Sequence, residues 1–177
     1  MTSKPLTPLG YALLGLITEE PRTGYALRKV FETTPLGNYS SSPGSIYPAL
    51  ATLERQGLVE TRGEGRGKGL FHLTPAGRDA FGAWLRAPVS GKDLNQAMLR
   101  FAFLQFNPDR ALTFSFLDSF ETAAAGEAEG LEAFLLSDFG RALPLQSRLA
   151  VEHGRRQLES SAQWAAWARR KLINEGE

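Results

Sequence analysis

Apolar residues in the first part of the chain recur at the spacing of amphipathic helices, with turn residues between the segments. Three helices are predicted, over residues 8–18, 24–32 and about 45–56. Thr7-Pro8 and Thr23-Gly24 are helix-start signals. Ile46, Leu50 and Leu53 form one apolar stripe on the third helix, and Gly57 is a natural stop. Two N-caps fit that third helix equally well, namely Ser42 followed by Pro43, or Ser45 with Pro48 in the first turn.

The pattern changes after Gly57, where two short apolar runs flank a glycine-rich segment. Residues 58–62 and 70–74 read as strands, and glycine occupies every second position from Gly63 to Gly69. Two short strands joined by such a loop predict a β-hairpin. Thr74-Pro75 then begins a fourth helix that extends through Leu85.

Strand signals are absent beyond the linker at residues 88–92. Helices are predicted over 94–106, from 107 to about 135, and over 145–173, with a bend at 140–144. The fold class is therefore mostly α with a small β-hairpin. We expect two domains: a winged helix-turn-helix at residues 1–87 and an all-helical domain at residues 92–177.

Composition narrows the chemistry. The chain has no cysteine, and its two histidines, His72 and His153, fall in different predicted domains, so no metal-ligand spacing is present. No clustered nucleophile and base is visible, and we expect no enzyme activity, metal or cofactor. Lys68 is followed by glycine rather than Ser or Thr, which argues against a phosphate-binding loop. Without a signal-like or membrane-spanning apolar run, we expect a cytoplasmic protein that makes no membrane contact.

The order helix, helix, helix, hairpin, helix is typical of a winged helix, which places its third helix in the DNA major groove. Residues 1–86 carry ten Lys and Arg against seven Asp and Glu, a modest basic excess. The third helix is expected to turn small and hydroxylic side chains outward, opposite its apolar stripe. The predicted DNA-facing residues of this region are Ser42, Ser45, Tyr47, Ala49 and Thr52, together with Arg66 and Lys68 at the tip of the wing.

Several segments resemble the PadR family of transcriptional regulators. They are Leu9–Ile17 (Leu-Gly-Tyr-Ala-Leu-Leu-Gly-Leu-Ile), Thr23–Leu27 (Thr-Gly-Tyr-Ala-Leu), Gly44–Leu50 (Gly-Ser-Ile-Tyr-Pro-Ala-Leu), Leu53-Glu54, Gly57–Val59 and Leu73–Gly77 (Leu-Thr-Pro-Ala-Gly). The resemblance implies a homodimer joined through the C-terminal helices, a two-fold DNA operator, and repression until a small, often aromatic, effector binds. It adds Tyr25 to the DNA-facing residues. The glycine-rich wing, which contains Glu64, departs from the bulkier basic wing of that family.

Each candidate residue has a plainer alternative role. Tyr25 fits a core position as well as a DNA contact, Ser45 fits a simple helix cap, and Arg66 and Lys68 fit a solubilising turn. For Trp164 and Trp167 the plainer role is packing in a dimer, and the sharper one is an aromatic wall for a flat effector. The other candidate effector residues are Trp84, Phe101 and Phe103. A winged-helix module that binds a protein instead of DNA is the alternative function.

Overall fold

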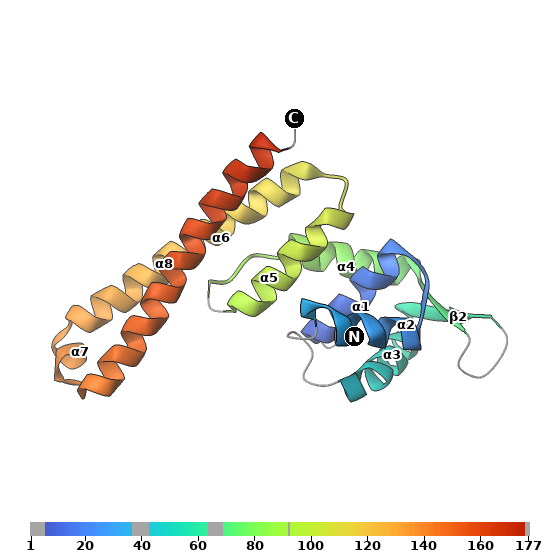
Figure 1. Cartoon of the computed structure of the whole chain (residues 1–177), viewed down its shortest axis with the longest axis horizontal. Helices are drawn as coiled ribbons and strands as arrows, with labels where there is room; N and C mark the ends of the chain where they lie inside the picture. The colour runs from blue at the N-terminus through green and yellow to red at the C-terminus, as the bar shows by residue number, and fades with distance from the viewer. Residues whose placement is uncertain (1–5, 37–42, 64–68, 92, 176–177) are drawn as a thin grey trace. The chain divides into compact units, whose positions relative to one another are not determined.

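The computed structural model describes residues 6–36, 43–63, 69–91 and 93–175, and these divide into two compact units (Figure 1). The first unit contains residues 1–87 and 98–108, and the second contains residues 88–97 and 109–177. The predicted boundary lay between 87 and 92. The difference arises because Met98–Pro108 packs with the first unit rather than with the later helices.

The helices and strands predicted for residues 1–87 appear in the predicted order, with one additional strand. The elements of the first unit are α1 (Pro8–Glu19), β1 (Arg22–Thr23), α2 (Gly24–Thr33), the 3-10 turn η2 (Pro43–Ser45), α3 (Ile46–Arg55), β2 (Val59–Arg62), β3 (Leu70–Leu73), α4 (Pro75–Arg86), the end of α5 (Leu94–Phe103) and the 3-10 turn η3 (Leu104–Phe106). The addition is β1, which pairs with β3 and makes an antiparallel sheet in the order β1-β3-β2.

Threonine caps begin three helices of this unit. The hydroxyl of Thr7 accepts from the Gly10 amide, that of Thr23 from the Ala26 amide, and that of Thr74 from the Gly77 amide. Each hydroxyl satisfies an amide that the first helical turn leaves without a partner. These local bonds explain why the predicted helix starts are confirmed.

The core of the first unit is built around α1, which is buried on nearly every side. Leu13 and Leu14 are fully enclosed, and Leu27 of α2 and Leu50 of α3 pack into the same core. A helix that is apolar all round belongs at the centre of a small domain. The mainly helical architecture with a hairpin is thus the predicted winged helix.

The second unit is a helical hairpin. Its main elements are α6 (Arg110–Leu136), α7 (Asp138–Ala142) and α8 (Leu145–Asn174). Asp118 pairs with Arg169, and Phe120 lies edge-on to Trp164, so α6 and α8 run antiparallel. The bend predicted at 140–144 is partly wrong, because Ser137 caps the short helix α7 by accepting from the Gly140 amide.

Candidate nucleic-acid interface

Helix α3 is held firmly at one face and at its end. Ile46, Leu50 and Leu53 are almost fully buried, as the apolar stripe predicts. After the helix, Gly57 has a φ of 69°, the Gly57 amide donates to Glu54 O, and the Leu58 amide donates to Leu53 O. This pair of bonds is a Schellman motif, which satisfies carbonyls at the helix end and turns the chain into β2. The outward face of α3 is therefore presented by a rigid helix.

The outward face differs in register from the prediction. Ser45, Ala49 and Thr52 were expected opposite the apolar stripe, but they are only half-exposed. Ala49 lies one turn before Leu53, and residues four apart share a side of a helix, so this set flanks the buried stripe. The stripe that faces away from the core consists of Pro48, Ala51 and Arg55, with Tyr47 beside it.

Arg55 is the functional candidate that the sequence analysis missed. Its Nη2 donates to Thr52 Oγ1 at 2.9 Å, and the Thr52 hydroxyl donates to Pro48 O at 2.9 Å. The Thr52 hydroxyl therefore forms its hydrogen bonds within α3, where it orients the Arg55 side chain. The spacing of three and four that joins Pro48, Ala51 and Arg55 was the signal that would have found it.

Two exposed tyrosines lie where α2 and α3 meet. Tyr25 is 61% exposed and Tyr47 is 49% exposed, so Tyr25 is not a core residue. A Cβ added at Gly24 would lie 2.8 Å from Tyr47 Cε1, which means that the Tyr47 ring needs the glycine to pack where it does. The guanidinium of Arg28 lies 5.8 Å from the centroid of the Tyr25 ring. Phenol and guanidinium groups can both donate to phosphate oxygens.

The wing is joined to α3 at its base. The Thr61 hydroxyl of β2 donates to Glu54 Oε1 of α3 at 2.7 Å, which ties the strand to the helix. Ser42, Arg66 and Lys68 lie outside the described residues. The roles predicted for them, and the DNA contacts predicted for the other residues, stay predictions.

The candidate effector residues are found in both units. Trp84 and Phe103 are buried in the first unit, where Trp84 stacks on Tyr11 at 4.6 Å and lies edge-on to Phe103. Phe101 is half-buried in the same unit. In the second unit, Trp164 contacts Phe120, whereas Trp167 is 52% exposed.

A buried arginine accompanies the tryptophan of the first unit, and the sequence analysis did not identify it. Arg100 lies over the Trp84 ring at 5.6 Å and donates to Ala87 O at 2.6 Å. Burial lowers the pKa of Arg100, and the nearby Tyr11 opposes that shift. The sequence signal that could have identified Arg100 is a charged residue among the apolar positions of α5.

Among the described residues, no group of three or more His, Cys, Asp or Glu side chains is placed to hold a metal ion. No helix in the described ranges is both long enough and apolar enough to cross a membrane.

The order of elements and the outward face of α3 define a winged-helix protein. Residues 13–83 match the family described as "Transcriptional regulator PadR-like family". A curated relative, "Transcriptional regulator YqjI" of Escherichia coli (strain K12), is 39% identical over 69 residues, which are 39% of this chain and 33% of that protein. The chain thus spans about a third of the length of the curated relatives that it matches.

Solved structures of Bacillus subtilis PadR also align with the chain. The crystal structure in complex with operator DNA is 20% identical, covers 95% of this chain and 99% of that chain, and has a TM-score of 0.43. The crystal structure in complex with p-coumaric acid is 20% identical, covers 97% of this chain and 99% of that chain, and has a TM-score of 0.43.

Proposed function

We propose that this protein is a sequence-specific DNA-binding transcriptional regulator that reads the major groove with α3. The observation that carries the proposal is the stripe of Pro48, Ala51 and Arg55 on a helix whose other face is buried. Small side chains let a helix approach base edges closely, and an arginine at the end of the stripe can bind guanine or phosphate. The PadR-like domain, which contains the whole of α3, supports the same function.

The proposal includes a homodimer that binds a two-fold operator. A single winged helix has a small footprint, and two linked copies bind more tightly because the second contact is intramolecular. The second unit supplies apolar side chains for such a contact, since Leu145, Leu149 and Trp167 are more than half exposed.

We further propose that the protein represses transcription and is released by a small, flat effector. In the second unit, the Phe120–Trp164 pair and the exposed Trp167 offer aromatic side chains of the required chemistry, whereas Trp84 of the first unit is buried. An effector releases DNA only if it binds better to the form of the dimer that fits the operator less well. A transcription assay on the protein's own upstream region, with and without candidate aromatic effectors, tests this part.

The decisive experiment measures DNA affinity by fluorescence anisotropy at two salt concentrations, for the upstream duplex and for an unrelated duplex. We expect tight binding that favours the upstream duplex and weakens with salt, because cations are released from the phosphates. Arg55→Ala should cost about 1–3 kcal/mol and relax sequence preference. Ala51→Glu should weaken binding to both duplexes, because it places a carboxylate on the face that approaches DNA.

The matched control is Arg86→Ala, which removes an exposed arginine of α4 that donates within its own helix to Gly82 O. Its DNA affinity should equal that of the wild type. Unchanged affinity in both α3 variants, with folding verified by circular dichroism, would contradict the assignment of α3. Equal weak binding to both duplexes would favour the alternative, a winged helix that binds a protein partner.

A further inference from the structure

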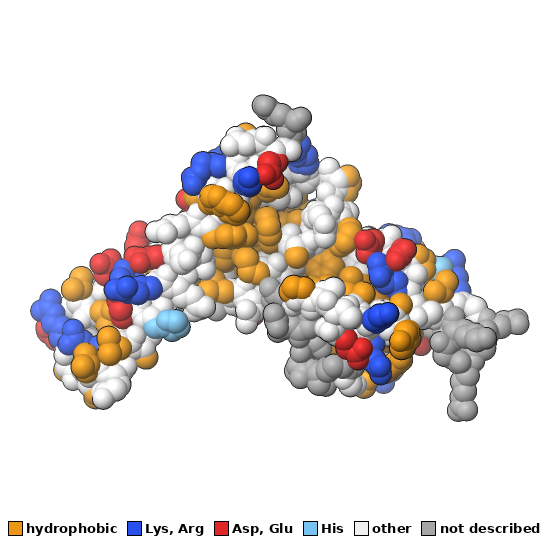
Figure 2. Space-filling view, viewed as in Figure 1, with side chains coloured by type: hydrophobic (Ala, Val, Ile, Leu, Met, Phe, Trp, Pro, Cys, Tyr) orange, Lys and Arg blue, Asp and Glu red, His pale blue; other side chains and the backbone are white. Residues whose placement is uncertain are grey.

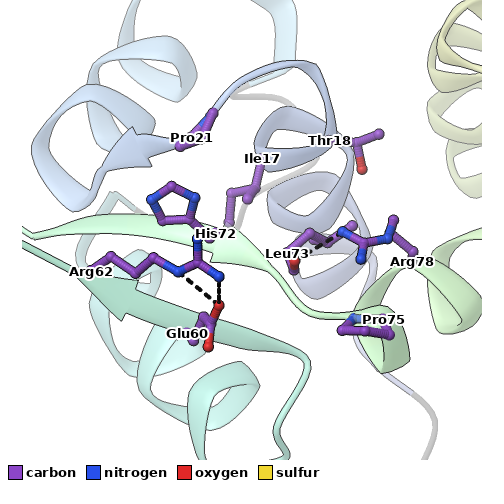
Figure 3. Close-up of a pocket in the computed structure, with 9 residues that line it drawn as sticks. All are labelled: Ile17, Thr18, Pro21, Glu60, Arg62, His72, Leu73, Pro75 and Arg78. Carbon is purple, nitrogen blue, oxygen red and sulfur yellow. Dashed lines mark hydrogen bonds and ion pairs between the residues drawn. The ribbon is translucent and has the colours of Figure 1, made fainter.

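A groove opens on the first unit beside the sheet, and none of its lining residues belongs to α3 (Figure 3). Its volume is about 470 Å³, within the usual 300–1,000 Å³ of small-molecule sites. The lining residues come from the end of α1, the turn before β1, strands β2 and β3, and the start of α4: Ile17, Thr18, Pro21, Glu60, Arg62, His72, Leu73, Pro75 and Arg78. All of them belong to one compact unit, so the groove is complete within a single copy.

The charged side chains that line the groove are Arg62, Arg78 and Glu60, so their net charge is one positive charge. Arg62 is paired with Glu60, with Nε at 2.9 Å from Oε1. Arg78 donates through Nη1 to Leu73 O at 3.1 Å, and it forms no ion pair with any residue that the structure describes. His72 lies across the strand pair from Glu60 and adds a ring nitrogen that can donate. A group with one negative charge matches this surplus, whereas Glu60 would repel a dianion.

The rest of the lining is largely apolar. Ile17, Pro21 and Pro75 flank the cationic groups from three different elements, and the close-up shows them around the same opening (Figure 3). An open groove that combines polar and apolar lining can bind both parts of an amphipathic ligand.

We propose that this groove binds a small organic carboxylate. The carboxylate accepts hydrogen bonds from Arg78, and the body of the ligand extends along the groove past Ile17 toward Pro21 and His72. An arginine is well suited to the first role, because its planar fork of N–H donors matches the two oxygens of a carboxylate.

The position of the groove gives it a route to α3. Successive side chains of a strand point to opposite faces, so Glu60 lines the groove while its neighbour Thr61 bonds to Glu54 of α3. A carboxylate that competes with Glu60 for Arg62 would act on the strand that supports the recognition helix. This regulatory consequence rests on the proposed function, but binding in the groove does not.

The test is a titration of the ¹⁵N-labelled full-length protein, without DNA, followed by NMR of the backbone amides and arginine Nε–H groups. Benzoate is the probe, and inorganic phosphate at matched ionic strength is the comparison. We expect saturable shifts of the groove residues with benzoate at millimolar concentration, as suits a ligand of this size. Arg78→Gln should raise the dissociation constant about tenfold or more.

Two further variants make the result specific. Arg86→Gln, on the same helix, removes an arginine that also donates to a main-chain carbonyl, and it should leave benzoate binding unchanged. Thr18→Glu adds a negative charge at the rim and should abolish binding. The proposal is overturned if benzoate gives no saturable shift, if Arg78→Gln binds as tightly as the wild type, or if phosphate binds as tightly as benzoate. Because DNA is absent, failure here leaves the DNA-binding proposal to its own test.

Discussion

The two units bury their apolar residues in opposite ways. In the first unit, α1 has 12 residues and buries eight of them, including its leucines and its isoleucine. In the second unit, α8 has 30 residues and buries only Ala165 and Ala168. The first unit therefore encloses its own core, whereas α8 has only small residues at its buried positions and packs them against α6, which buries Phe116, Leu117 and Phe120.

The residues of the hairpin show why this happens. Ala124 and Ala128 of α6 and the two buried alanines of α8 let the helices approach closely. Leu136, Phe139, Leu145 and Leu149 are then more than half exposed, and Figure 2 shows apolar side chains on the surface around α7. Apolar surface of this kind marks an interaction site when it is contiguous, and it is the surface that the proposed homodimer would use.

The largest expected effect is on the free energy of unfolding when alanine replaces a tightly packed glycine of the first unit. A Cβ at Gly77 of α4 would lie 2.0 Å from Leu58 O, a main-chain atom that cannot move aside alone. Gly77→Ala should lower the free energy of unfolding by about 3 kcal/mol or more, measured by urea denaturation. Gly126→Ala in α6 is the matched control, because no atom lies within 4 Å of its added Cβ. The Gly126→Ala variant should be more stable than the wild type by about 0.5–1 kcal/mol. Equal losses of unfolding free energy in both variants would contradict the difference in packing between the two units.

The next effect concerns the exposed leucines. Leu149→Glu should weaken self-association by about 1–3 kcal/mol, because it places a charge on surface that a partner buries. Sedimentation equilibrium would show this as a rise of about fivefold or more in the dimer dissociation constant, with the helical circular dichroism unchanged. Ser147→Glu, also exposed on α8, controls for added charge. A dimer that tolerates Leu149→Glu as well as Ser147→Glu would place the interface elsewhere.

Local features of the fold could be predicted from the sequence, and non-local ones could not. The threonine caps and the turn at Gly57 depend on residues within a few positions, so the sequence analysis located them. Strand β1 has two residues, and its partner β3 begins more than forty residues later, which leaves no periodic signal. The burial of Arg100 against Trp84 is equally non-local.

The candidate interface was predictable in part for a similar reason. The buried stripe of α3 follows directly from apolar spacing, and it was confirmed. The outward face was chosen by residue type, which favoured Ala49 and Thr52 over Arg55. Register decides exposure on a helix, so counting three and four residues from Pro48 would have given the most exposed face.

A smaller effect compares two caps within the first unit. Thr74 Oγ1 accepts from the Gly77 amide at 3.0 Å and donates to Gly57 O at 2.7 Å, joining α4 to the end of α3. Thr23 Oγ1 accepts from the Ala26 amide at 3.1 Å. Thr74→Ala should cost about 1–2 kcal/mol and Thr23→Ala about 1 kcal/mol or less, measured by urea denaturation. A larger loss of unfolding free energy in Thr23→Ala than in Thr74→Ala would show that the hydrogen bond from Thr74 to Gly57 O adds no stability.

The smallest effect is a pH dependence confined to the second unit. Hydrogen bonds from Arg155 and Arg156 lower the pKa of Glu152 from 4.5 to about 2. Because the folded pKa is depressed, the stabilisation is present above about pH 4.5 and is lost as the pH falls toward 2. Glu152→Gln should therefore melt slightly below the wild type at pH 5, by circular dichroism, and the difference should shrink by pH 2. The effect is small because the groups lie at the surface, within reach of solvent that screens their charges. A difference in melting temperature that stays constant across this range would show that the arginines hold Glu152 equally well without its charge.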